Sequence, residues 1–482
     1  MSIVSKSVQI LRMAAAFLLL PLLASSCQWV TDDYDDETAD VSNATQYINI
    51  TISVSASESP VTRAPLGGEE GDGREKGIDT RENLVEGVTL IFYQDAPNTT
   101  AGINATAANA AATTIDHAVY YTVSRDDDHA YAHPTRHTGE VFYTTGDQEL
   151  TEPLSSENDY HLLVVANADL TQGSDRIIPG TTTLAQVRDM TYSAVYSGTG
   201  KGTEATKFVM TSEEDCILDF NYSTYNKALN RRTFQLDCIH MERMAARIDY
   251  CTEGADSYDT NLGGYKYPVG TNGGYFVVTK VTPFNLYDGS EYVFKRVRNN
   301  WTDVTPSISW LGDETTTNYV VDPNTANKDN NHSFTYLSPV AQNMDNGYTQ
   351  SMSSAQNQNK ENVIICYTRE NTLKPASPLK KYATGLAFEI KYYVTADATP
   401  VTRVYYHYLR HQGEMSSGSY QAYLWADLSD ETTCGTTPMN YGIVRNNIYR
   451  VTVNSFTPLE GVLKITIEEK HWRHVDNPTI YI

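Results

Sequence analysis

Short stretches rich in β-branched and aromatic residues follow one another through most of this chain, each bounded by Gly, Asn, Asp or Ser. This pattern is typical of β-strands, whereas helical spacing of apolar residues is scarce. Strands are expected over 88–94, 118–124, 160–169, 274–284, 362–370 and 385–395. One short helix is expected over 182–190, where Leu184, Val187 and Met190 recur at a spacing of three after a threonine. The sequence therefore predicts an all-β fold made of antiparallel β-sandwiches.

The length of the chain indicates more than one domain. About 450 residues remain after the N-terminal segment described below, which is more than one hydrophobic core usually serves. The joint is expected near 212–240, where a polar stretch leads into a long strand-like run. We therefore predict a first sandwich over 64–235 and a second over 236–482. Two polar tracts of low complexity, 96–115 and 323–359, are expected to be long surface loops.

The first residues carry a targeting signal. Basic residues precede an apolar run at 13–23, which at ~1.5 Å per residue spans only about half of a ~30 Å hydrocarbon core. Such a run is typical of a signal peptide, predicted here as residues 1–27. Small residues then lead to Cys27, an order that resembles the lipobox of bacterial lipoproteins, where the cysteine is acylated. An ordinary signal peptide with a chance cysteine is the alternative.

Charge and cysteine spacing exclude several classes of partner and site. The chain has 59 acidic and 36 basic side chains, and its net charge of −23 would repel a phosphate backbone, so no nucleic-acid partner is expected. The cysteines after Cys27 are widely spaced and include no CxxC pair, so we expect buried thiols instead of a disulfide framework or a zinc site. They are Cys216, Cys238, Cys251, Cys366 and Cys434.

An early segment, QYINITISVS, has the alternation of a strand with one buried face. Its apolar residues Ile48, Ile50, Ile52 and Val54 fall on every second position, so they share one face of an extended chain. The segment then runs into Ser, Pro and Arg63, well before the rest of the chain begins to form strands.

Several segments, in order along the chain, resemble the fimbrillin family, and most closely the minor fimbrium subunits of type V pili in Bacteroidales. The run 444–449, VRNNIY, is the most specific of them. The segments are the lipobox, YINITISVS followed by Arg63-Ala64, YHLLVVAN (160–167), FVMTS (208–212), MERMAARIDY (241–250), YGIVRNNIYRVTVNSF (441–456) and HWRHVDNPTIYI (471–482). The resemblance implies two transthyretin-like sandwiches, a lipid anchor in the outer membrane before processing, trimming by an arginine-specific protease, and polymerisation with other pilus subunits by strand exchange at the cell surface.

The resemblance also assigns roles to particular residues. Residues 28–63 become an acidic tether with a removable first strand, and cleavage falls between Arg63 and Ala64. Arg74 and Arg81 lie in an equally Gly-rich stretch and are rival cleavage sites. The alternative is that the first strand is permanent, as in anchor subunits that are not trimmed.

Removal of the first strand would have a large energetic cost. Burial of its four aliphatic side chains contributes roughly 6–12 kcal/mol, comparable with the ~5–15 kcal/mol stability of a whole domain. The groove left behind must therefore be filled by a neighbour's strand, which is β-strand addition used for polymerisation. The candidate donor is the C-terminal stretch, through Leu463, Ile465, Ile467, Ile480 and Ile482.

The sequence offers little catalytic or metal-binding chemistry, and no cofactor or metal is expected. His129, His133 and His137 are spaced by four beside three aspartates, but Pro134 would break a helix there, so a solvated loop is expected. The Gly-rich run 197–203 lacks the residues of a phosphate-binding loop, and no nucleophile has a recognisable base partner. We therefore predict that the chain is not an enzyme.

Aromatic residues support a second hypothesis of another class. Trp301, Trp310, Trp425 and many tyrosines could stack on sugar rings, as in a monomeric glycan-binding outer-membrane lipoprotein built from β-sandwiches. Tyrosine and tryptophan are equally expected as sheet and core residues, so the cluster YYHYLR at 405–410 is expected to be structural.

Overall fold

The structure is a computed structural model, and it confirms the predicted fold class. The described part is almost all β, with several sheets and three short α-helices. It comprises residues 44–55, 80–95, 102, 105–126, 140–155, 159–193, 207–212, 216–218, 223–270, 273–287, 289–298, 308–309, 319–323, 325, 334–335, 348–355, 357–410, 417–428, 433–436 and 438–471. No helix among these residues is both long and apolar enough to cross a membrane.

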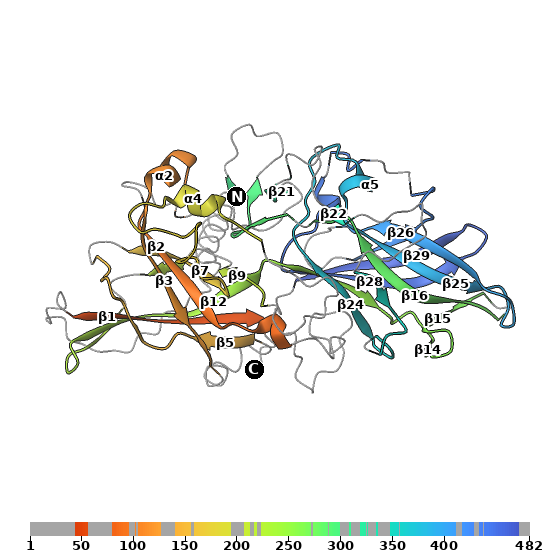
Figure 1. The fold of residues 1–482 in the computed structure, drawn as a ribbon, viewed down its shortest axis with the longest axis horizontal. Helices are drawn as coiled ribbons and strands as arrows, with labels where there is room; N and C mark the ends of the chain where they lie inside the picture. Colours follow the sequence, from red (N-terminus) through yellow and green to blue (C-terminus); the bar gives the residue numbers. More distant parts are fainter. Residues whose placement is uncertain are drawn as a thin grey trace, which may run out of the picture.

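The elements fall into two lobes that lie side by side along the long axis (Figure 1). The first lobe contains β1 (Thr45–Ser55), η1 (Thr80–Asn83), β2 (Gly87–Tyr93), α2 (Ala107–Ala112), β3 (Ile115–Thr122), β4 (Ser124–Arg125), β5 (Glu140–Thr144), β6 (Gln148–Glu149), β7 (Tyr160–Ala166), α4 (Leu184–Asp189), β8 (Thr191–Tyr192), β9 (Met210–Ser212), β10 (Cys216–Leu218), β11 (Ser223–Asn226) and β12 (Arg231–Arg243).

The second lobe contains β13 (Ala246–Cys251), β14 (Ser257–Asp259), β15 (Gly264–Val269), β16 (Gly274–Phe284), β17 (Leu286–Tyr287), β18 (Glu291–Tyr292), β19 (Val297–Arg298), β20 (Ile308–Ser309), β21 (Tyr319–Val320), β22 (Phe334–Thr335), β23 (Gln350–Ser351), β24 (Asn362–Thr368), α5 (Leu379–Tyr382), β25 (Gly385–Tyr393), β26 (Val401–Tyr408), β27 (Ser417–Ala422), η4 (Pro438–Tyr441), β28 (Asn447–Thr457) and β29 (Val462–His471). The chain passes from the first lobe to the second between β12 and β13.

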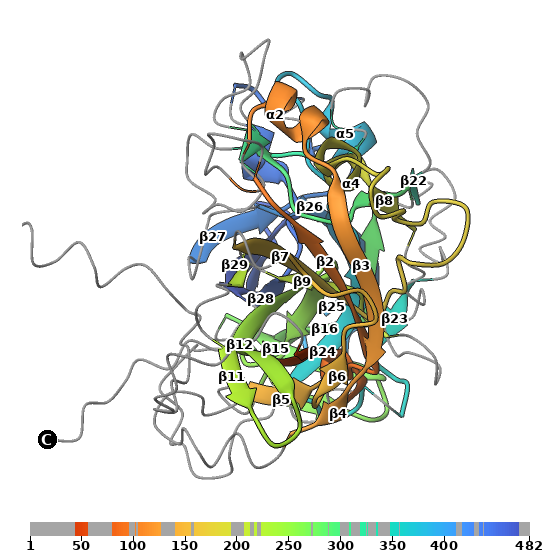
Figure 2. The ribbon, with the colours of Figure 1, turned by 90° about the vertical axis from the view of Figure 1, so that its left-hand side faces the viewer.

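One folded sheet forms the first sandwich. Its strand order is β3-β2-β7-β9-β12-β1-β5-β4, and the long strand β12 pairs with β1 through its first part and with β9 through its last three residues. The strand β12 therefore carries the sheet from one layer to the other. Viewed end on in Figure 2, β5, β6 and β11 lie below β2, β7 and β9. The core between the layers contains apolar side chains of β1, β2, β7 and β12.

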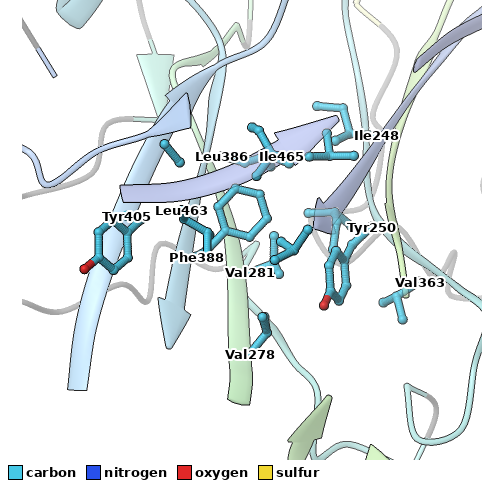
Figure 3. Close-up of a cluster of buried hydrophobic side chains, with 14 of the residues drawn as sticks. Ile248, Tyr250, Val278, Val281, Val363, Leu386, Phe388, Tyr405, Leu463 and Ile465 are labelled. Atoms are coloured by element: carbon cyan, nitrogen blue, oxygen red, sulfur yellow. The ribbon is translucent and has the colours of Figure 1, made fainter. Parts of the chain in front are cut away.

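Two separate sheets form the second sandwich. The order in one is β24-β13-β28-β29-β27, and in the other β14-β15-β16-β25-β26. Their inner faces enclose a core in which Ile248, Phe388 and Ile465 are 0–1% exposed (Figure 3). Most pairs are antiparallel, as expected, but each lobe contains a parallel pair, β1 with β12 and β13 with β28.

The expected strands and helix are confirmed, but both expected loops were wrong in part, since 323–359 contains the short strands β22 and β23, which pair with β17 and β16. Strands lie within or across all six predicted segments, and α4 begins after Thr183, whose hydroxyl and Gln186 form a capping box. The expected loop at 96–115 was wrong in part, because it contains the helix α2. Alanine is the best helix former, and the Thr106 hydroxyl accepts a hydrogen bond from the backbone N–H of Asn109 at 3.3 Å, which together favour one helical turn there.

Candidate functional site

The predicted removable strand is an interior strand of the first lobe. Figure 1 shows β1 between β12 and β5. It pairs in parallel with β12 from Thr45 to Ser53, and on its other edge it pairs antiparallel with β6 and then with β5. Both edges of β1 are therefore hydrogen-bonded to neighbours. Loss of this strand would open the sheet along two edges at once.

The inner face of β1 is the alternating apolar set that the sequence predicted. Ile48 and Val54 are 0% exposed, and Ile50 and Ile52 are 1% exposed. All four belong to the core of the first lobe, together with side chains of the opposite layer such as Leu90. The strand thus closes the hydrophobic core, so its removal would expose apolar surface in that core.

A register shift keeps the two strands facing the same core. Ile50 is opposite Leu236, but Ile52 is opposite Ile239, so β12 contains one extra residue at this point. A one-residue slip without this bulge would turn the following side chains of β12 to the other face. The bulge therefore preserves the burial of Ile239 beneath β1.

Polar groups along the edge that faces β5 and β6 fix the register of β1. The Gln46 side chain donates to the carbonyl of Leu154 at 3.0 Å and accepts from its N–H at 2.8 Å. Asn49 donates to Asp147 and accepts from the Thr144 hydroxyl, both at 3.0 Å. Between these points the Ile50 N–H donates to the Thr145 hydroxyl at 3.0 Å, where β5 and β6 are interrupted. These contacts specify one register for a strand whose alternation alone would allow a shift by two.

The slot is the space that β1 occupies between β12 on one edge and β5 and β6 on the other. Near the C-terminal end of β1, a partly buried polar contact joins it to β12, in which the Ser53 hydroxyl lies 2.6 Å from Nδ1 of His240. Near the N-terminal end of β1, the Arg231 guanidinium lies 3.9 Å from the Tyr47 ring centroid. Sequence analysis missed Gln46, Thr145 and His240, because nothing local in the sequence indicates which distant strand each one contacts.

The segment that follows the predicted cleavage point is anchored independently of β1. Glu82 of η1 is 0% exposed, and its carboxylate lies 3.1 Å from Arg247 of β13 and accepts a hydrogen bond from Tyr367. Arg247 also pairs with Asp249 at 2.8 Å. Burial raises the pKa of Glu82 above its ordinary value, and the Arg247 charge acts against this shift. The element η1, which follows the predicted cleavage point, is therefore fixed to the second lobe.

The sequence motifs that carry the family resemblance meet where the two lobes join. Asn446 adopts a positive φ of 58°, donates its N–H to the Ala245 carbonyl at 2.8 Å and accepts from the Arg243 N–H at 3.2 Å. The neighbouring Arg445 is fully buried, and its guanidinium lies 2.8 Å from Glu370. The VRNNIY and MERMAARIDY runs therefore build the junction, which gives them a structural role.

Other contacts also bridge the lobes. The short strands β8 and β18 pair with each other, and Lys295 lies 3.1 Å from Glu242 of β12. Tyr367 and Ile448 of the second lobe belong to the apolar core of the first. The two sandwiches thus share packing and hydrogen bonds.

The remaining predicted site residues fall into two groups. Cys27, Arg63, Ala64, Ile480 and Ile482 lie outside the described residues, so lipidation and cleavage stay predictions. Leu463, Ile465 and Ile467 are 0–1% exposed in β29, which pairs with β28 and β27. Their use as a donor would require β29 to leave its own sheet.

The described residues offer no cluster of metal ligands. Within the described ranges no group of three or more His, Cys, Asp and Glu residues could hold a metal ion. The histidines at 129, 133 and 137 and the Gly-rich run 197–203 lie outside those ranges, as do Trp301 and Trp310. The side chains of Cys216, Cys251, Cys366 and Cys434 are buried, as the sequence predicted.

Comparisons with known proteins find similar structures only. No family model and no curated protein matches the chain. One similar structure is the tip fimbrial protein Mfa3 from Porphyromonas gingivalis with a C-terminal truncation, at 8% identity and a TM-score of 0.37, covering 88% of this chain and 100% of that one. A fimbrial assembly protein from Parabacteroides distasonis has 9% identity and a TM-score of 0.33, covering 87% and 95%. The fimbrial anchor protein Mfa2 from P. gingivalis has 9% identity and a TM-score of 0.25, covering 89% and 99%.

These three neighbours are named as fimbrial proteins. At identities near 10% and TM-scores below 0.5 they carry no argument about function. The functional argument therefore depends on the residues of this chain.

Proposed function

We propose that this chain is a subunit of an adhesive fimbrium on the cell surface, that it is exported as a lipoprotein through Cys27, and that it polymerises by strand exchange after cleavage following Arg63. The observation that carries the proposal is the position of β1. It is an interior strand that completes the core of the first lobe, yet it precedes the proposed cleavage point. The sequence motifs described above supply the rest of the argument.

Cleavage would sever the covalent link without disturbing either side of it. The strand β1 ends at Ser55, and the chain is next described at Thr80, where η1 is held by Glu82 in the junction. A cut at Arg63 falls between these two fixed points. The strand would then be held only by non-covalent contacts and could be replaced by a segment of another subunit.

The proposed incoming segment is the C-terminal one. The part of the candidate donor within β29 is already buried in its own sheet. We therefore assign the donor role to the residues after His471, in which Ile480 and Ile482 repeat the alternating spacing of β1.

The experiment is arginine-specific proteolysis of the purified precursor. The expected result is a mature N-terminus at Ala64 by mass spectrometry, together with ladders on a gel and filaments on a microscope grid. Arg63→Lys should prevent both the cleavage and the polymerisation, whereas Arg74→Lys should prevent neither. Protein that is cut at Arg63 but stays monomeric would refute the proposal for this subunit.

A further inference from the structure

A partly open cavity of about 410 Å³ lies in the second lobe where β26, β27 and η4 meet. Its size is within the ~300–1,000 Å³ range of small-molecule sites. Part of its lining comes from the 405–410 cluster, which sequence analysis expected to be structural. Tyr405, Tyr406 and Tyr408 do pack in the apolar cores, and His407, Tyr408 and Arg410 also line this cavity.

The floor of the cavity contains polar atoms that lack partners. The Nε2 atom of His407 and the hydroxyls of Tyr408 and Tyr441 are buried and have no hydrogen-bond partner in the structure as described. These three side chains are only 7%, 5% and 3% exposed. Buried polar groups are nearly always satisfied, so these three atoms are available to form hydrogen bonds with a bound group or with solvent in the cavity.

The protonation state of His407 defines what it can bind. Burial lowers the pKa of His407 to about 3, so the ring is neutral at physiological pH. Its Nδ1 lies 3.0 Å from the Gln421 carbonyl oxygen, which can only accept a hydrogen bond. The single ring proton is therefore on Nδ1, and Nε2 is an acceptor that requires a donor such as a hydroxyl.

The walls of the cavity are aromatic. The Tyr420 ring lies 5.2 Å from the His407 ring, and the Arg410 guanidinium lies over Tyr420 at 5.3 Å and over Tyr441 at 4.5 Å. Arg410 thus covers one face of the Tyr420 ring and one face of the Tyr441 ring, and Tyr423, which is half-buried, adds a third ring to the lining that can pack against the C–H face of a sugar.

The rim of the cavity is polar and exposed. It carries the Ser419 hydroxyl, the Gln421 amide and the Asp427 carboxylate. The Tyr423 hydroxyl donates to the Gln421 side-chain oxygen at 2.6 Å, which leaves the amide N–H₂ to serve as a donor. The rim thus offers both donors and acceptors.

We propose that this cavity binds a saccharide residue, with one face of the ring against the tyrosines and its hydroxyl groups bonded to the rim and to the buried floor atoms. An apolar peptide side chain would fit less well, because Leu428 is the one aliphatic residue that lines the cavity within the described part of the chain. A nucleotide is disfavoured by the net charge of −23. The inference does not rest on strand exchange, because β26 and β27 lie in the second lobe, away from β1 (Figure 1).

The test is binding of defined sugars to the chain before cleavage at Arg63, which keeps it independent of strand exchange. Saturation-transfer NMR and calorimetry would use the methyl glycosides of glucose, galactose, mannose, N-acetylglucosamine and N-acetylneuraminic acid, together with disaccharides of each. We expect at least one of them to bind. Tyr420→Ala and Asp427→Asn should each weaken that binding by about tenfold or more, which corresponds to the loss of one good contact. Tyr225→Ala, in the first lobe, is the matched control and should leave the affinity unchanged.

Each result has a clear meaning. Asp427 is exposed, so Asp427→Asn should keep the melting temperature of the parent and separates a binding defect from unfolding. Tyr420 packs against the core of the second lobe, so Tyr420→Ala should lower the melting temperature, and its binding is measured well below that temperature. Failure of every sugar in the panel to bind would overturn the proposal. Binding that survives both cavity variants, or that falls equally in Tyr225→Ala, would also overturn it.

Discussion

The contribution of Ile50 to the free energy that binds β1 in the slot provides a quantitative test of the proposed exchange. The side chain is 1% exposed and packs in the core of the first lobe. Truncation of a buried isoleucine to alanine costs about 2–5 kcal/mol, since the lost transfer energy is increased by the cavity left behind. In the cleaved protein this cost falls on the non-covalent binding of β1. Ile50→Ala should therefore weaken that binding roughly 30- to 4,000-fold.

The assay follows release of the strand after cleavage. A fluorophore attached to the segment before β1 would report, by anisotropy, the rate at which the strand leaves the cut subunit. Ile50→Ala should accelerate release and polymerisation together. Asn49→Ala is the control on the opposite face of β1, where loss of the contacts to Asp147 and Thr144 should cost about 1 kcal/mol for each hydrogen bond.

One outcome would refute the reasoning. If release from Ile50→Ala is no faster than release from Asn49→Ala, burial of the apolar face is not what holds β1 in the slot. Ile50→Val, with an expected cost of about 0.5–1.5 kcal/mol, provides an intermediate point if the alanine precursor does not fold.

Three further outcomes are expected. Glu82→Gln should lower the free energy of unfolding by about 1–3 kcal/mol, because Arg247 loses one buried carboxylate but keeps Asp249 as its partner. Glu86→Gln, in an exposed pair with Lys207, should cost less than about 1 kcal/mol, and equal effects of the two substitutions in urea unfolding would contradict this. Burial raises the pKa of Glu291 from 4.5 to about 8, so its contribution to stability is fully present below pH 4.5 and is lost as the pH rises through 8. The unfolding free energy should therefore fall by a few kcal/mol across this range relative to Glu291→Gln, and parallel pH profiles of the two proteins would refute the assignment. Burial also raises the pKa of the Cys366 thiol, so mass spectrometry should find it unmodified by iodoacetamide in the native protein and modified in urea.

The all-β class and the inner face of β1 could be predicted because both depend on local patterns. Alternation along 48–54 is a property of adjacent residues, and the structure buries all four predicted side chains. The helix α4 was predictable for the same reason, since its cap and its apolar spacing lie within nine residues. In contrast, α2 was missed because its alanines were interpreted only as low complexity.

The neighbours of β1 could not be predicted from the sequence. Pairing with β12 joins Ile48 to Phe234, and no local pattern encodes a contact over that separation. The buried charges at the junction were also unpredictable. Charged residues such as Glu82 and Arg445 are usually exposed in folded proteins. Both are buried here because each is paired with an opposite charge that only the fold brings near it. The cavity near His407 was missed for a related reason, since it depends on strands brought together in space.

The parallel pairing of β1 with β12 has a consequence for any assembly that uses the slot. In the slot, β12 is parallel to β1 and β5 is antiparallel to it. The bulge in β12 also lies at one fixed position, between Leu236 and Ile239. A replacement segment that reproduces these hydrogen bonds must enter in a single orientation. Every joint between subunits would then be head to tail, and a filament built from such joints would have two chemically different ends, with growth confined to those ends.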